Sequence, residues 1–511
     1  MYFLMNLKEW CKNNYNKVIF ISLCIFSSIV YMQFIMGHYA TDTYNIAYVG
    51  YDTYMKNWYL TDGRIFSAMF LLIMKICNLP VHSANTISLL FAIVITNISV
   101  MKIFNWTEKY VQTKNIKEKI ILLIICYVIF WNFTYIENMY FLESSIMALS
   151  VLFYTMSAIS LVEKNKYSFL KALMFAILGI ISYQGTIGFL FILTALLTFI
   201  KNPKNYKANI VDIVKSGLIA GMAVIVDFAI VAIVENLIGT KQTRLSDFTR
   251  IFLNIKIILK NTKDVLTKTC NLYPENLFII WIIALLAILF VYEIKNKDEL
   301  IKEKVSVILK YILLVILAIF SSSVIYIISM SGFWAGRLRF AIGSLIGILF
   351  LYIATQTRLF FRKEAKEKTF VSDVTIVLLV IYFLTVVVFN VFFMYEHRQV
   401  NKLEKQESER ILEYISKYEE ETKNEVKKVQ VITIECEEEK SYYSQVAAHN
   451  VLTYNGLSAN WSAVGCLNFF SQKELIEEKG EISQEILYEV MDNVEDEVCI
   501  GDTIYMKCYM Y

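Results

Sequence analysis

The stretch GHYATDTYNIAYVGYDTYMKNWYLTDGRIFSAMFLLIMKIC, residues 37–77, decides how the rest of the chain has to be arranged. It directly follows the first long apolar run and contains three spaced aspartates, many tyrosines and the tripeptide Asp62-Gly63-Arg64. A weakly charged, aromatic segment with spaced carboxylates is unusual for a connection that has only a structural role. We therefore interpret it as a functional site at a membrane surface, held in place by the remaining chain.

Apolar runs of membrane-spanning length recur from Val18 to Tyr395, and 57% of the 511 residues are hydrophobic. A helix needs roughly 20 mostly apolar residues to cross a bilayer. The sequence therefore predicts an all-α polytopic membrane protein without a cleavable signal peptide. Eleven transmembrane helices are expected, near residues 18–36, 82–103, 119–136, 141–162, 168–184, 186–200, 211–236, 276–294, 305–329, 338–357 and 371–395.

The basic residues predict the orientation, because short cytoplasmic loops are enriched in Lys and Arg. With a cytoplasmic N-terminus and eleven crossings, the lysine-rich loops all fall inside; they lie at 104–118, 163–167, 201–210, 295–304 and 358–370. This orientation requires that the apolar segment 64–77 does not cross, so we expect a membrane-embedded or interfacial helix there. Alternatively, 64–77 crosses and pairs with 82–103, which would invert every later loop.

The chain after Tyr395 predicts a separate compartment. A charged segment with a helical pattern is followed by strand-like runs at 429–434 and 503–509. We therefore expect a transmembrane domain over 1–395 and a small extracytoplasmic α+β domain over 396–511.

Four of the nine cysteines fall in the predicted outer domain: Cys436, Cys466, Cys499 and Cys508. They could form two disulfides or remain free. The sequence has no CxxC motif, HExxH motif or histidine cluster, so we predict neither a metal site nor another cofactor. The net charge of +3 gives no indication of nucleic acid, and no such partner is expected.

Asp42, Asp52 and Asp62 are the candidate catalytic residues. A carboxylate at the membrane–water boundary is partly desolvated, which raises its proton affinity and suits it to act as a general base. Asp42 is the leading candidate because it comes six residues after the first predicted span. The alternative is structural, since Asp42 and Asp62 could each cap a following helix.

Arginines are the candidate ligands for a phosphate group. Arg337 and Arg339 lie at the edge of a predicted span, and Arg64 begins the predicted non-crossing helix 64–77. A guanidinium group in either place can pair with the phosphate of a lipid-linked substrate. They could instead anchor the protein at the lipid headgroups.

Other polar residues lie near the predicted outer face. Glu137 flanks an outer turn, and Gln184 is a candidate to bind a hydroxyl group or to pack between helices. Glu143, Asp227 and Lys310 are rare charges in or near the predicted spans, where an ionisable group is costly.

The order of Asp42, Gly50-Tyr51, Trp58 and Gly63-Arg64 resembles the bacterial and phage O-antigen glucosyltransferases, multi-pass enzymes of the GT-C class. Tyr183-Gln184 and Arg337 are also similar to that family. The resemblance implies a GT-C-like fold in the cytoplasmic membrane and an inverting hexosyltransferase. It would use a polyprenyl-phosphate sugar donor and a cell-surface glycan acceptor at the outer face of the bilayer, with no cofactor. Among the substrate-binding residues it implies are Tyr51, Trp58, Glu137 and Gln184.

Two other functions remain open from the sequence. A transporter or flippase of lipid-linked sugars would need polar residues inside several spans. An assembly or sensor protein would function through its outer domain. The enzyme is favoured if the carboxylates of 37–63 and the arginines of 332–339 come together at one outer face.

Overall fold

A computed structural model of the chain describes residues 14–239, 250–295, 300–323, 327, 335–357, 366–435, 452, 454–471, 473–493 and 496–510. The helices are α2 (Tyr15–Val30), α3 (Met32–Ile35), α4 (Thr41–Tyr54), α5 (Ile65–Ile76), α6 (Val81–Val111), α7 (Ile116–Phe130), α8 (Ile136–Tyr140), α9 (Ser144–Glu163), α10 (Ser168–Ser182), α11 (Gly188–Lys201), α12 (Tyr206–Ile238), α13 (Ile251–Lys268), α14 (Leu277–Lys295), α15 (Ile301–Ser321), α17 (Phe340–Thr357), α18 (Lys366–Thr422), α19 (Ala463–Phe470) and α20 (Gln484–Asp492). The shorter helical turns are η1 (Met55–Tyr59), η2 (Phe133–Tyr135), η3 (Gln184–Thr186), η5 (Thr269–Asn271) and η6 (Gly336–Arg339). The strands are β1 (Lys428–Glu435), β2 (Ile476–Glu477), β3 (Glu497–Ile500) and β4 (Thr503–Met510).

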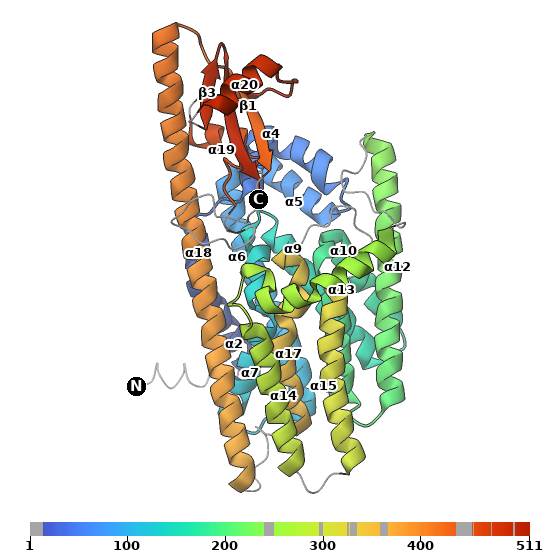
Figure 1. The fold of residues 1–511 in the computed structure, drawn as a ribbon. Helices are drawn as coiled ribbons and strands as arrows, with labels where there is room; N and C mark the ends of the chain where they lie inside the picture. Colours follow the sequence, from blue (N-terminus) through green and yellow to red (C-terminus); the bar gives the residue numbers. More distant parts are fainter. Residues whose placement is uncertain are drawn as a thin grey trace, which may run out of the picture.

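Most of the chain forms a bundle of long apolar helices (Figure 1). Among the described residues, eight helices are long and apolar enough to cross a membrane, and nine if the pair α7 and η2–α8, bent by 46°, counts as one span. The prediction of an all-α polytopic membrane protein is therefore confirmed. The number of eleven spans stays a prediction, which requires that the shorter apolar helices α2 and α10 also cross.

Polar residues begin and end the apolar helices. The Asn115 side chain accepts a hydrogen bond from the backbone N–H of Glu118 at the start of α7, and Asn205 does the same for Ala208 at the start of α12. Gly239 ends α12 with a φ of 75°, a conformation that glycine adopts without strain. Short polar turns thus separate the long apolar helices.

The short helix α5 lies at the same end of the molecule as α4 and the C-terminal strands (Figure 1). Its 12 residues extend about 18 Å at 1.5 Å per residue, far less than the ~30 Å of a hydrocarbon core. This length agrees with the expectation that the segment does not cross the membrane.

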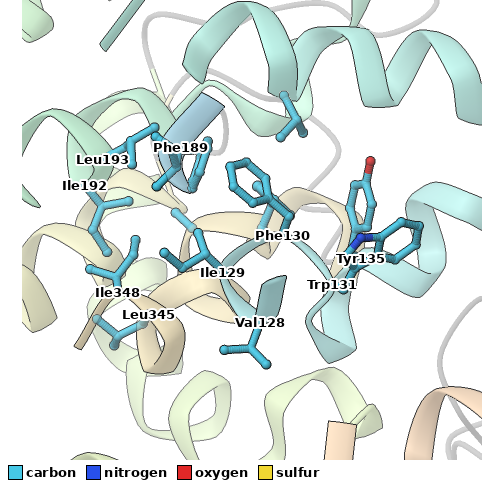
Figure 2. Close-up of a cluster of buried hydrophobic side chains, with 14 of the residues drawn as sticks. Val128, Ile129, Phe130, Trp131, Tyr135, Phe189, Ile192, Leu193, Leu345 and Ile348 are labelled. Carbon is cyan, nitrogen blue, oxygen red and sulfur yellow. The ribbon is translucent and has the colours of Figure 1, made fainter. Parts of the chain in front are cut away.

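In the core of the bundle, the backbones of α7 and α17 are in direct contact. A Cβ atom on Gly347 would lie 2.7 Å from the backbone nitrogen of Ile129, and one on Gly343 would lie 2.1 Å from Thr134 Oγ1. Small residues four positions apart allow such close helix approach in membranes. Around this contact, side chains of α7, α11 and α17 fill the space; Figure 2 shows them, including Phe130, Phe189, Leu345 and Ile348.

The last membrane helix continues into the C-terminal region without a break. Helix α18 has 57 residues and extends about 86 Å, and it runs the full height of the molecule (Figure 1). The domain boundary predicted at 395/396 therefore falls inside a helix. Both the apolar segment and the charged segment after it have helical periodicity, so no turn separates them.

Beyond α18 the chain forms a four-stranded sheet in the order β2-β1-β4-β3. Strand β1 is parallel to β2 and β4, and β3 is antiparallel to β4. The strands predicted at 429–434 and 503–509 correspond to β1 and β4. Cys466, Cys499 and Cys508 are free thiols, whereas Cys436 lies outside the described residues. Two disulfides among the four cysteines would require one bond between two of Cys466, Cys499 and Cys508, and no such bond is present.

The C-terminal domain packs against α4 through buried hydrogen bonds. The Glu404 carboxylate of α18 accepts from the Tyr44 hydroxyl at 2.6 Å and from the Gly456 backbone N–H at 2.7 Å. Helix α19 packs so closely that a Cβ atom on Gly465 would lie 2.5 Å from the Tyr44 carbonyl oxygen. The domain therefore fixes the position of the helix that carries Asp42.

The orientation can be tested by labelling single cysteines in intact cells, in a variant that lacks the native cysteines. Because the basic loop at Lys114 is expected inside, Lys114→Cys should react with a membrane-impermeant maleimide only after permeabilisation. Lys479→Cys, on an exposed side chain of the C-terminal domain, should react without it. Reaction of position 114 from outside would contradict the orientation and favour a crossing helix at 64–77.

Candidate active site

Arg64 is the centre of a buried cluster at the end of the bundle where α5 begins. Its Nη2 lies 3.5 Å from Asp62 Oδ2, its Nη1 lies 3.4 Å from Glu143 Oε1, and its guanidinium carbon lies 5.2 Å from the centre of the Tyr183 ring. Burial alone would lower the pKa of Arg64, but the charges of Asp62 and Glu143 outweigh it and hold that pKa above its ordinary value. Arg64 therefore stays positively charged inside the protein.

Glu143 joins this cluster from the turn before α9. It is almost completely buried, and it accepts a hydrogen bond from the Tyr59 hydroxyl at 2.5 Å. Burial raises the pKa of Tyr59 well above its ordinary value, and the nearby Glu143 raises it further. Tyr59 therefore stays protonated and donates the hydrogen bond to Glu143. Glu143 is absent from the predicted site residues; the one sequence signal was an acid at the edge of an apolar span.

Gly63 brings the Asp62–Arg64 turn against α12. It has a φ of +75°, and a Cβ atom there would lie 2.7 Å from Asp227 Oδ1. The Gln184 side chain spans the same contact, donating to the Asp62 carbonyl oxygen at 2.5 Å and to Asp227 Oδ2 at 3.4 Å. Because no other residue is both strain-free and small enough at this position, the turn requires glycine.

Asp42 lies in the first turn of α4 and is half-buried. In the described part of the chain it makes no hydrogen bond or ion pair, although its charge acts on Tyr59, Glu143 and Tyr140. Asp42 is thus a partly desolvated carboxylate without a fixed partner, close to the Arg64 cluster.

Arg337 approaches the same region from η6. Its backbone N–H donates to the fully buried Glu137 carboxylate at 2.8 Å, and its guanidinium carbon lies 4.5 Å from the centre of the Phe141 ring. The charge of Arg337 acts on Tyr140, which also interacts with Asp42. The charges of Asp42 and Arg337, residues almost 300 positions apart in the sequence, therefore both act on Tyr140.

Arg339 lies deeper than Arg337. Its side chain is almost completely buried, with Nη1 3.4 Å from Ser323 Oγ beside the end of α15. Residues Gly332 to Trp334, the aromatic part of the predicted stretch, lie outside the described residues.

Three predicted residues lie apart from this centre. Asp52 forms an ion pair with Lys75, and both side chains are about half exposed. The Tyr51 hydroxyl donates to the Leu79 carbonyl oxygen at 2.9 Å, and Trp58 stacks on Tyr54 with ring centres 4.7 Å apart. These contacts hold α4, η1 and α5 together, and Asp52 is already paired with Lys75.

A bundle of apolar helices with a buried cluster of acidic and basic side chains at one end defines a multi-pass membrane protein with an enzyme-like site. The family model Glucosyl transferase GtrII matches residues 31–354, so the chain belongs to this glucosyltransferase family. The matched segment contains every residue of the site described above and ends before α18. A comparison with curated proteins finds no match.

The packing around Gly63 gives a prediction for stability. Gly63→Ala should lower the free energy of unfolding by about 1 kcal/mol for the positive φ and by a further 1–3 kcal/mol for the contact with Asp227 and Val231. Gly239→Ala is the matched control, because Gly239 has the same φ but no atom within 4 Å of its Cβ position. Thermal denaturation in detergent compares the two, and equal losses would contradict the close contact.

Proposed function

We propose that the protein transfers a hexose from a polyprenyl-phosphate donor to a hydroxyl group of a cell-surface glycan, at the outer face of the cytoplasmic membrane. The observation that carries this proposal is the unpaired, half-buried Asp42 carboxylate beside the Arg64 cluster and near Arg337. Membership of a glucosyltransferase family supports the reaction class.

In the proposed reaction Asp42 is the general base. The acceptor hydroxyl oxygen attacks the anomeric carbon while a carboxylate oxygen of Asp42 takes its proton. The bond between the anomeric carbon and the phosphate oxygen breaks on the opposite face, so the configuration inverts. The electron pair leaves with the polyprenyl phosphate, whose negative charge must be stabilised by the protein.

Arg337 is the better candidate for that phosphate. Around Arg64, three carboxyl groups surround one guanidinium group: Asp62 and Glu143 pair with it, and the charge of Asp227 acts on it. A phosphate at Arg64 would meet an excess of negative charge. We therefore assign Arg64 to positioning, Arg337 to the donor phosphate, and the buried Arg339 to the support of η6.

The division of the chain follows from the same proposal. Residues 1–395 form the transferase domain with a cytoplasmic N-terminus, and 396–511 form an extracytoplasmic domain on a helix that both share. Since this domain packs on α4 beside Asp42, it borders the space through which a glycan acceptor would approach.

The distribution of charges favours an enzyme over a transporter. Asp227 is about 32 Å along α12 from Tyr206, next to the Arg64 cluster, whereas Lys310 donates to the Pro203 carbonyl oxygen in the turn before α12. These charges thus lie toward opposite ends of the bundle and do not form a continuous polar path among the described residues.

Asp42→Asn tests the base. It keeps the size of the side chain but removes the proton acceptor, so turnover should fall roughly 10²–10⁴-fold while donor binding stays nearly unchanged. Single-turnover transfer from a defined polyprenyl-phosphate glucose to glycan extracted from cells lacking the gene would measure it. Asp52→Asn, on the same helix, is the comparison; a loss of turnover there with normal turnover in Asp42→Asn would contradict the assignment.

Arg337→Ala tests the phosphate contact. Hydrogen bonds to charged groups contribute roughly 1.5–3 kcal/mol, so the donor Kd should rise by about 10- to 150-fold. Arg337→Lys should restore only part of the affinity, because lysine lacks the bidentate fork. Titration calorimetry with the donor measures both variants, and donor affinity that is unchanged in both would place the phosphate elsewhere.

A further inference from the structure

Unpaired polar atoms gather beside the Arg64 cluster, on the side of α12. In the described part of the structure, Asp227 Oδ1, the Tyr154 hydroxyl and Arg64 Nε are buried from solvent and have no hydrogen-bond partner. Tyr154 is completely buried, and the charge of Asp227 acts on it. The second oxygen of Asp227 accepts from Gln184, 3.4 Å away. Donors and acceptors are therefore both left unsatisfied within one small region.

The surrounding helices are shaped to keep these groups in place. A Cβ atom on Gly179 of α10 would lie 2.7 Å from the Tyr154 ring, so glycine makes the room that this ring occupies. Side chains on a helix lean toward its N-terminus, which directs Tyr154 of α9 toward the end of the bundle that carries the Asp62–Arg64 turn. Gly63 brings that turn within contact of Asp227.

The unpaired atoms indicate the chemistry of a ligand. Leaving a buried polar group without a partner is costly, and more so for a carboxylate. A phosphate would satisfy Arg64 but would be repelled by Asp62, Glu143 and Asp227. A sugar ring carries neighbouring hydroxyl groups that each donate and accept a hydrogen bond, so it matches a set that contains both unpaired acceptors and unpaired donors.

We propose that Asp227, Gln184 and Tyr154 form a subsite that binds the hydroxyl groups of a pyranose ring. The ring belongs either to the transferred hexose or to the acceptor glycan, and this assignment rests on the proposed function. Asp227 accepts from a ring hydroxyl, Tyr154 donates to or accepts from a neighbouring one, and Arg64 holds the carboxylates around them.

The test is a double-mutant cycle that combines Asp227→Asn in the protein with the removal of single hydroxyl groups from the sugar. The donor probe is a short-chain prenyl-phosphate glucose together with its four monodeoxy analogues, titrated by calorimetry into the full-length protein in detergent. The acceptor probe is surface polysaccharide from cells lacking the gene, for which the KM of transfer is measured. Asp502→Asn, the same chemical change on an exposed side chain of the β3–β4 turn, is the matched control and should change neither value.

For a donor subsite, Asp227→Asn should raise the donor Kd roughly 10- to 100-fold. One monodeoxy analogue should lose a similar factor on the unmodified protein and lose little more on the variant, because both changes remove the same contact. If the losses of donor affinity are additive for every analogue and Asp227→Asn instead raises the KM for polysaccharide, the subsite binds the acceptor. Additive losses for every analogue with an unchanged polysaccharide KM would overturn the proposal.

Two further measurements keep the outcome interpretable. If Asp227→Asn does not fold, Tyr154→Phe replaces it, since this change removes only one hydroxyl group from the same subsite. Losses of donor affinity that are additive in the Tyr154→Phe cycle, with an unchanged polysaccharide KM, would equally overturn the proposal. The donor Kd is measured without turnover, so the Asp227 cycle does not depend on which residue is the base. If Asp42 is not the base, Asp42→Asn will show normal turnover, and the Asp227 cycle can still be interpreted. Additive donor losses and an unchanged polysaccharide KM for Asp227→Asn, together with reduced turnover in Asp42→Asn, would overturn the subsite alone.

Discussion

The site depends on the burial of Glu143 beside Arg64. A carboxylate removed from water is tolerated only if its oxygens are paired, and Glu143 gains its partners, Tyr59 and Arg64, from the two ends of the η1–α5 turn. This pairing ties a helix of only 12 residues to the long helix α9. A short helix has little stability of its own, so the charged contacts and the Gly63 packing give it a defined position.

The same contacts divide the site into two electrostatic halves. Carboxyl groups outnumber cations on the side of α12, whereas on the side of η6 the Arg337 cation lies beside one carboxylate, that of Glu137. Asp42 interacts with Glu143 on one side and with Tyr140 on the other. In the proposed reaction, the hydroxyl-rich sugar of the donor would lie toward Asp227 and its anionic phosphate toward Arg337.

The sequence predicted the elements better than their contacts. Hydropathy located the helices because each one must be apolar along its length, but it ended the last span at Tyr395, where α18 continues to Thr422. Local spacing selected Asp42, Arg64 and Gln184 as candidate site residues, and their roles stay predictions. It could not identify Asp227 as a partner of Gly63, nor pair Asp52 with Lys75, because those contacts depend on how helices pack and not on the residues next to them.

The contact between Tyr44 and Glu404 joins residues 360 positions apart, and this spacing has a consequence for biogenesis. Helix α4 is synthesised and inserted early, but the surface that it packs against is complete only when β4 and α19 have left the ribosome and folded. Until then α4, the helix that carries Asp42, lacks its contacts with Glu404 and α19. A nascent or truncated chain therefore lacks the contacts that hold α4, and this end of the bundle is complete only when the whole chain has been made.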